Sequence, residues 1–533
     1  MTTKNVYSIS SMKDKMRDTI PCRIEFIKEL LKDKKLEPLV DFDRTDTEYF
    51  VQNVKEEDAS GKSYDTKIVL KKRSLDFTNI ISQIGGKLKY IKSGTSGHTF
   101  KGEANDEFGS FEYAVKVVAY PIKERYGDIN DTRRPENAEL MMIKLLSYFI
   151  AKKQTPHIVL PIGTFNTKID VFVDLIDKNV VTSDTDKYQE FVKRYKNKEY
   201  HDTVSVLISE WANRGDLLDF IRKYHDEFSL THWKVLFFQV LSVLAVIQSK
   251  YPSFRHNDLK ANNLLVHKIK KQNEKFTYKV VRCVYSVPNI GYHVKLWDFD
   301  FSCIPGIVDN RKVESRWAKT QVNVTPTQNR YYDIHYFFNT LIKKGFCNEV
   351  MTSEKVPNEV KEFINRVVPK KYQKTGTEYV ADKGRILVND EYTTADELLK
   401  TDPFFADFRM FEPSKNTTVS STKNAKESMI KKSMSKDKIK KKTVGMPDLT
   451  KFLKNDSMSD EDDHIKKILR GGNNSGKHKK HASKSPPRKK TIKSIKPEKN
   501  QKKKLKKSHS RTISEEMREI DPELLFNKSS SSS

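Results

Sequence analysis

Cysteine is scarce in this sequence. The 533 residues include four cysteines, at positions 22, 283, 303 and 347, and no two of them form a C-x-x-C pair. This spacing suggests neither a disulfide framework nor a zinc site. It is compatible with a reducing compartment.

Long apolar runs are also missing. The first ten residues are polar and do not resemble a secretory signal peptide. The most apolar stretch, residues 233–247, is interrupted by Gln239 and Ser242 and is shorter than the roughly 20 residues that a membrane span needs. We interpret it as a buried helix and expect no membrane span.

Acidic residues are too few to balance the basic ones. The chain carries a net charge of +28, and residues 414–533 contribute 33 Lys and Arg against 14 Asp and Glu, which is +19 of that total. Lysine runs such as residues 502–507 cannot bury enough apolar surface to fold alone. We therefore predict a disordered basic tail over residues 412–533. Two interpretations are open: non-specific binding to nucleic acid or an anionic surface, or a solubilising or targeting segment.

One polar stretch carries chemistry. Residues 256–263 read His-Asn-Asp-Leu-Lys-Ala-Asn-Asn. Asp258 can accept the proton of an attacking hydroxyl, Lys260 can neutralise a moving phosphoryl group, and Asn263 can bind a metal ion. The stretch resembles the catalytic loop H-R-D-L-K-x-x-N of protein kinases, with Asn257 in the place of Arg. A polar surface loop is the alternative interpretation.

A glycine turn precedes this loop in the chain. Gly94 and Gly97 lie between two strand-like stretches, and such glycines let backbone N–H groups approach phosphates. The resemblance to the kinase glycine loop is partial, because Lys92 stands where its first glycine is expected. An ordinary hairpin turn is the alternative.

The strand that follows contains one lysine. Residues 111–118 read as a buried strand in which Lys116 needs an anionic partner. By resemblance to the V-A-I-K strand of kinases, Lys116 would hold the α- and β-phosphates of ATP and Ala114 would lie against the adenine. Glu139, on the helix expected next, is the predicted partner of Lys116, and Glu136 one turn earlier is the second choice.

A connector between two lobes is predicted near residue 209. The apolar stretch 204–212 resembles the kinase hinge, whose backbone at Glu210 and Ala212 would meet the adenine edge. Ser209 would take the gatekeeper position. Asp216 would face the ribose.

The metal-binding turn is expected at residues 294–301, which resemble the kinase strand and D-F-G turn. Asp298 would bind Mg²⁺. Asp300 replaces the glycine, which we expect to be tolerated because Asp adopts left-handed backbone more readily than most residues. Between Val266 and His293, the lysine-rich sequence predicts an inserted, solvent-exposed hairpin.

The last motifs lie in the C-terminal part of the domain. Residues 302–330 contain no A-P-E motif. Asp333 resembles the aspartate that holds the catalytic loop by accepting backbone N–H bonds, and a helix N-cap is the alternative. Residues 395–405 resemble the helix that closes many kinase domains.

Together these motifs make the sequence similar to Ser/Thr protein kinases, most of all to those of large cytoplasmic DNA viruses of the poxvirus and giant-virus types. The resemblance implies an α+β, bilobal protein-kinase-like fold. Its β-rich N-lobe would span about residues 81–209 and its larger helical C-lobe about residues 210–411. Residues 1–80 would be an N-terminal extension of unknown role.

The resemblance also implies transfer of the γ-phosphoryl group of ATP, with Mg²⁺, to Ser or Thr of protein substrates. Two alternatives are a choline- or aminoglycoside-like kinase on the same fold and a pseudokinase scaffold, in which Lys92, Asn257 and Asp300 would mark decay. Because Asn257 replaces the Arg that would receive an activation-loop phosphate, we expect activity without phosphorylation of residues 302–330. A cytoplasmic location, in a host cell or virion, is expected, and the lysine runs also allow the nucleus.

Overall fold

The structure, a computed structural model, describes residues 18–43, 55–57, 63–94, 97–106, 109–178, 180–181, 185–269 and 274–410. The predicted basic tail, residues 412–533, lies outside the described residues. So do Thr95 and Ser96, which stand between Gly94 and Gly97 in the sequence.

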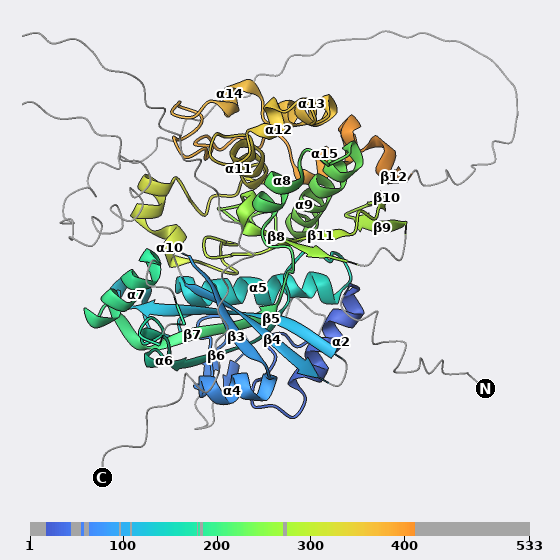
Figure 1. The fold of residues 1–533 in the computed structure, drawn as a ribbon. Coiled ribbons are helices and arrows are strands. Elements are labelled where there is room, and N and C mark those ends of the chain that lie inside the picture. Colours follow the sequence, from blue (N-terminus) through green and yellow to red (C-terminus); the bar gives the residue numbers. More distant parts are fainter. Residues whose placement is uncertain are drawn as a thin grey trace, which may run out of the picture. The chain divides into compact units, whose positions relative to one another are not determined.

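A five-stranded antiparallel sheet forms the N-lobe, in the order β3-β4-β5-β7-β6 (Figure 1). Its strands are β3 (Lys87–Ser93), β4 (His98–Asp106), β5 (Gly109–Pro121), β6 (Pro161–Lys168) and β7 (Tyr200–Glu210). Aromatic and β-branched residues give β5 its strand preference, and β5 pairs on both sides. Lys116 therefore lies inside the sheet, opposite Thr99 on β4 and Leu207 on β7.

Helix α5 (Pro135–Ala151) lies between this sheet and the helical part of the chain (Figure 1). Proline at its first position has no N–H to satisfy and a backbone angle suited to a helix start. The helix is buried along most of its length. It is thus held on both sides, and it carries Glu139.

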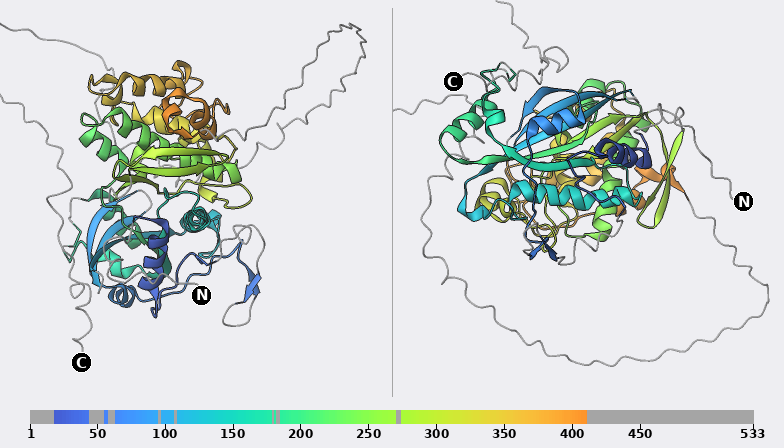
Figure 2. Two further views of the ribbon diagram at one scale, coloured as in Figure 1. Left: turned by 90° about the vertical axis from the view of Figure 1, so that its right-hand side faces the viewer. Right: turned by 90° about the horizontal axis from the view of Figure 1, so that it is seen from below.

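The N-terminal segment packs into the same core. Helices α2 (Ile20–Leu31) and α4 (Phe77–Ile84) bury apolar faces there, and the rings of Phe26 and Phe111 lie 5.3 Å apart edge to face. Both views in Figure 2 show α2, in dark blue, beside the sheet. The boundary predicted at residue 81 therefore left out α2 and divided α4, although both helices share the N-lobe core. Neither helix has a chemical motif that would have placed it in the domain.

The C-lobe is built on α9 (Leu230–Lys250), which is buried along most of its length, as predicted. The Ser229 side chain caps its start by accepting the His232 N–H. By length and composition α9 could cross a membrane, but 78% of its most apolar window is buried in this fold. The other main helices here are α8 (Leu217–Tyr224), α11 (Tyr332–Leu341), α13 (Asn358–Val367) and α15 (Ala395–Thr401).

Two small sheets accompany these helices. Strands β8 (Leu264–Lys268) and β11 (Tyr292–Leu296) pair and flank the active-site loops. The predicted insertion forms a hairpin of β9 (Lys275–Val280) and β10 (Cys283–Pro288), and β12 (Arg409–Met410) pairs with β10. The hairpin is not simply solvent-exposed, because Tyr278 and Tyr285 pack on Phe238 of α9 at 5.2 Å between ring centroids.

The remaining elements are short. They are β1 (Lys55–Glu57), β2 (Ser63–Asp65), η1 (Glu124–Tyr126), α6 (Asp170–Val173), α7 (Asp186–Lys196), η2 (Ala261–Asn263), α10 (Arg311–Glu314), η3 (Ala318–Val322), α12 (Glu349–Thr352), α14 (Lys370–Gln373) and η4 (Pro403–Phe408).

Candidate active site

A buried ion pair joins the sheet to α5. The Lys116 ammonium lies 2.5 Å from Glu139 Oε1, and 7% of Lys116 is exposed. Burial lowers the pKa of Lys116, but the carboxylates of Glu139 and Asp298 raise it more, so the lysine stays protonated. Glu136, the second choice, bonds Arg134 at 3.0 Å instead. The structure thus places Glu139 beside the strand lysine.

The same ammonium faces the metal-binding turn. Lys116 Nζ lies 3.3 Å from Asp298 Oδ1, although 182 residues separate them. Burial raises the pKa of Asp298 and the Lys116 charge lowers it, with a net lowering that keeps the carboxylate ionised. The left-handed backbone expected at Asp300 occurs at Asp298, whose φ is 62°.

Asp300 has a different role from the one its position suggested. Its carboxylate pairs with Lys312, and its backbone carbonyl accepts the Asn310 Nδ2–H at 3.0 Å. Lys312 also lies over the ring of Phe301, 4.0 Å from its centroid. Instead of supplying backbone freedom, Asp300 anchors the turn to the segment that follows it.

The catalytic loop is held from below by Asp333. Its two carboxylate oxygens accept the backbone N–H groups of His256 at 2.7 Å and Asn257 at 2.8 Å. These are the hydrogen bonds expected from the sequence, and Asp333 is fully buried. Asn257, at φ 64°, donates from Nδ2 to the Phe301 carbonyl at 2.9 Å. The residue in the usual arginine position therefore ties the catalytic loop to the metal-binding turn.

Donors surround the Asp258 carboxylate. Lys260 Nζ at 3.1 Å and Asn263 Nδ2 at 2.9 Å both contact Oδ2, and Arg385 Nη2 contacts Oδ1. Burial raises the pKa of Asp258, and the charges of Arg385 and Lys260 lower it further than burial raises it. The amide nitrogen of Asn263 is engaged by Asp258, which leaves its oxygen as the group available to a cation.

The glycine turn closes tightly. The Gly94 N–H donates to the Gly97 carbonyl at 2.7 Å, and a Cβ on Gly97 would lie 2.5 Å from the Val117 carbonyl oxygen. No side chain fits at Gly97 without moving the neighbouring strand. The turn thus lies against the strand that carries Lys116.

The residues of the predicted hinge lie on or just beyond the paired strands β5 and β7. Ala114 on β5 lies opposite Ser209 on β7, and Ala212 is buried just beyond the strand. The backbone N–H of Glu210 donates to the Leu160 carbonyl at 3.0 Å, and its carbonyl accepts the Ser209 hydroxyl at 3.4 Å.

The Glu210 side chain points into an ion cluster that we name the hinge cluster: Arg23, Glu210 and Lys295. Arg23 makes a bidentate contact with Glu210, with Nε 3.0 Å from Oε2, and Lys295 lies 3.0 Å from Oε1. Burial raises the pKa of Glu210, but the two cations bring it down to about 2. Arg23 comes from α2, so the segment of unknown role contacts the hinge directly.

Asp216, predicted to face the ribose, caps helix α8 in this structure. Its side chain accepts the Asp219 N–H at 3.0 Å at the start of α8. Lys92, which replaces the first glycine of the kinase loop, lies 3.9 Å from the same carboxylate. This pair connects the glycine turn with the start of α8.

The segment after the metal-binding turn is anchored by contacts of Arg311. Arg311 Nη2 lies 2.7 Å from Asp131 Oδ2, and the Arg311 N–H donates to the Arg133 carbonyl at 2.9 Å. Asp131 and Arg133 belong to the loop before α5. Residues 302–330 are therefore connected to the helix that carries Glu139.

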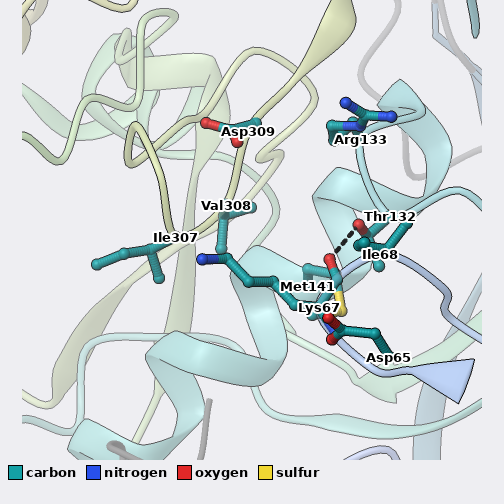
Figure 3. A pocket seen from close by; sticks show the side chains of 9 residues that line it. All are labelled: Asp65, Lys67, Ile68, Thr132, Arg133, Met141, Ile307, Val308 and Asp309. Atoms are coloured by element: carbon teal, nitrogen blue, oxygen red, sulfur yellow. Dashed lines mark hydrogen bonds between the residues drawn. The ribbon is translucent and has the colours of Figure 1, made fainter. Parts of the chain in front are cut away.

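A cavity of about 310 Å³ lies beside this junction (Figure 3). Its lining comes from three segments: Asp65, Lys67 and Ile68; Thr132, Arg133 and Met141; Ile307, Val308 and Asp309. None of the predicted site residues is in this lining. The cavity is thus distinct from the site that contains the Lys116–Asp298 contact.

The fold and this site define a class. A β-rich lobe with a Lys–Glu pair, a helical lobe with an Asp-Leu-Lys-x-x-Asn loop, and a second aspartate facing the lysine together describe a protein kinase. A profile of the poxvirus serine/threonine protein kinase family matches residues 125–393. The chain belongs to this family and is a serine/threonine kinase.

Relatives in Acanthamoeba polyphaga mimivirus agree. One, named as a putative serine/threonine-protein kinase, is 44% identical over 404 residues, which cover 74% of this chain and 82% of the relative. A second with the same kind of name is 24% identical over 296 residues, covering 49% of this chain and 70% of the relative. An uncharacterized protein of the virus is 25% identical over 313 residues, covering 57% of this chain and 34% of its own length.

Sequence reasoning missed Arg385, Arg23 and Lys312 at this site. Arg385 and Arg23 lie 127 and 187 residues from the residues they contact, and Lys312 lies 12 residues after Asp300. An isolated Arg or Lys in a loop or helix is usually a solvated residue. Arg23 is buried with Ile27, Leu30 and Leu31 on one face of α2. A basic residue on the apolar face of a predicted helix is a weak sequence signal that it has a buried partner. Arg385 and Lys312 have no local pattern that would identify them.

Proposed function

We propose that the protein transfers the γ-phosphoryl group of ATP to Ser or Thr hydroxyls of protein substrates. The convergence of Lys116, Glu139 and Asp298 carries this proposal, because a fixed ammonium beside an ionised carboxylate suits a nucleotide with a bound cation. Ala114, Ala212 and the Glu210 carbonyl would receive the adenine, and Gly94 and Gly97 would lie over the phosphates.

Asp258 would orient the attacking hydroxyl and accept its proton. The new P–O bond forms to the substrate oxygen while the bond between the γ-phosphorus and the bridging oxygen breaks, and ADP leaves. Lys260, beside Asp258, would balance charge on the moving phosphoryl group. Lys116 would hold the α- and β-phosphates.

A divalent cation fits two of these residues. Asp298 is an ionised carboxylate with 36% of its side chain exposed, and Asn263 has an amide oxygen free of Asp258. Hard oxygen donors of this kind suit Mg²⁺, which takes most of its remaining ligands from water and phosphate. When bound, the cation would neutralise charge on the phosphates.

The test is a γ-phosphate transfer assay on casein and basic protein. Asp258→Ala should reduce kcat by about 10²- to 10⁴-fold, the range for a positioned acid–base group. The matched control is Asp407→Ala, which removes a surface partner of Lys234 and should keep wild-type activity. Transfer to choline or an aminoglycoside instead of protein would favour the small-molecule alternative. No transfer, with no thermal shift by ATP and Mg²⁺, would favour the scaffold.

The basic tail supports a second, additional function. A net charge of +19 over residues 414–533 favours non-specific association with DNA or RNA. A chain that ends at residue 413 should bind duplex DNA more weakly, with a shallower dependence on salt, in titrations at two ionic strengths. Unchanged affinity would instead favour a solubilising or targeting tail.

A further inference from the structure

Arg385 lies outside every motif discussed above, yet it contacts the proposed catalytic aspartate directly. Its Nη2 donates to Asp258 Oδ1, and its Nη1 donates to the backbone carbonyl of Asn257. It lies 127 residues after Asp258 in the chain, and 4% of it is exposed. The guanidinium thus holds the carboxylate and the loop backbone together.

Arg385 is itself fixed from two directions. On one side its guanidinium lies 4.2 Å from the ring centroid of Tyr336, and Nη1 is 3.3 Å from the Tyr332 hydroxyl, both on α11. On the other side its backbone carbonyl accepts the Ala381 N–H at 2.8 Å, which closes a turn through Gly384 at φ 85°. Because the planar Arg385 guanidinium is already fixed, it loses little further conformational entropy when it orients the Asp258 carboxylate.

The two carboxylate oxygens of Asp258 have separate donors. The catalytic loop supplies Lys260 and Asn263 to Oδ2, whereas Arg385 alone contacts Oδ1 among the described residues. Without Arg385, the carboxylate could rotate about its last side-chain bond. Small rotations matter, because a misplacement of about 1 Å can cost a hundredfold in rate.

We infer that Arg385 is a positioning residue for the phosphoryl-transfer step, which fixes Asp258 against the substrate hydroxyl from a segment outside the catalytic loop. The inference rests on the proposed function. It extends that function by naming a residue that no kinase motif in this sequence marks. Arg385 acts through Asp258 and not by direct contact with the ATP phosphates or the substrate hydroxyl.

The experiment compares full-length wild type with Arg385→Met and Arg385→Lys in the transfer assay. For Arg385→Met we expect kcat to fall about tenfold to a hundredfold, the scale of a misplaced group, while KM for ATP stays the same. Arg385→Lys keeps a charged donor without the planar fork, so it should recover only part of the lost kcat.

The matched control is Arg330→Met, which removes another arginine–carboxylate pair, with Glu391, beside α11 but away from Asp258. It should lower the melting temperature while kcat stays near the wild-type value. If Arg385→Met does not fold, Arg385→Lys decides by its loss of kcat against wild type. Unchanged or increased kcat, or a loss of kcat/KM that comes wholly from a higher KM for ATP, would overturn the inference while leaving the proposed function standing. An inactive wild type would overturn both.

Discussion

Two lysines show how surroundings decide what a buried ammonium does. Lys116 has two carboxylates beside it and stays charged. Lys72 bonds the Tyr120 hydroxyl and Ser205 Oγ, the latter at 2.9 Å, and burial lowers its pKa to about 7. Only the first environment is suited to an anionic ligand.

This contrast gives a matched pair of variants. Lys116→Met should lose the stabilisation by ATP and Mg²⁺, which for wild type is about 2.7 kcal/mol at a hundredfold excess over Kd. Lys72→Met should retain that gain even where its own melting temperature changes, because Lys72 does not face Glu139 or Asp298. Thermal unfolding with and without nucleotide measures both. Equal gains for the two variants would mean that Lys116 does not hold the phosphates.

At the scale of elements, α2 is attached to the hinge by charge. In the hinge cluster, Arg23→Met leaves Glu210 buried with Lys295 as its remaining cation. Breaking a buried pair in this way typically costs about 3 to 5 kcal/mol. We expect a loss of that order in the free energy of unfolding at neutral pH, measured by denaturant titration.

The loss should depend on pH. The pKa of Glu210 is lowered to about 2 in the folded protein, against an ordinary value of 4.5. A depressed carboxyl pKa stabilises the fold fully above the ordinary value, and this contribution disappears as pH falls through the folded-state value. The difference between wild type and Arg23→Met should therefore be largest above about pH 5 and shrink toward pH 2. A difference that stays constant over this range would show that Arg23 acts through packing alone.

The segment after the metal-binding turn provides a further prediction at this scale. Arg311 already links it to Asp131, and Asn257 cannot receive a phosphate as an arginine would. Phosphatase treatment should leave kcat unchanged, whereas Arg311→Met should lower it several-fold by loosening α5. Loss of activity after phosphatase, with recovery on rephosphorylation, would contradict the first expectation.

For the molecule as a whole, the two ends of the chain should differ in importance. A chain that begins at residue 81 loses α2 and the first half of α4, with core residues such as Ile27 and Phe77. It should be unstable or insoluble. A chain that ends at residue 413 keeps every element described here and should keep its transfer activity. Expression, circular dichroism and the transfer assay on both truncations test this expectation.

The sequence was sufficient for those parts of the fold and site that are local in the chain. The catalytic loop, the strand lysine and the α9 helix each have a motif or a periodicity within a few residues. Arg385 and Arg23 could not be found this way, because their partners lie 127 and 187 residues away. Asp300 was interpreted from backbone preference, and an ion pair with Lys312 determined its role instead.

The hinge cluster also constrains which substitutions can accumulate in this sequence during evolution. Removing any one of its three charges breaks a buried ion pair, whereas replacing the whole set by apolar side chains of similar volume is often neutral. Selection should therefore remove single substitutions at Arg23, Glu210 or Lys295. Simultaneous replacement of all three residues should be tolerated. Across divergent homologues, the three positions should change together or not at all.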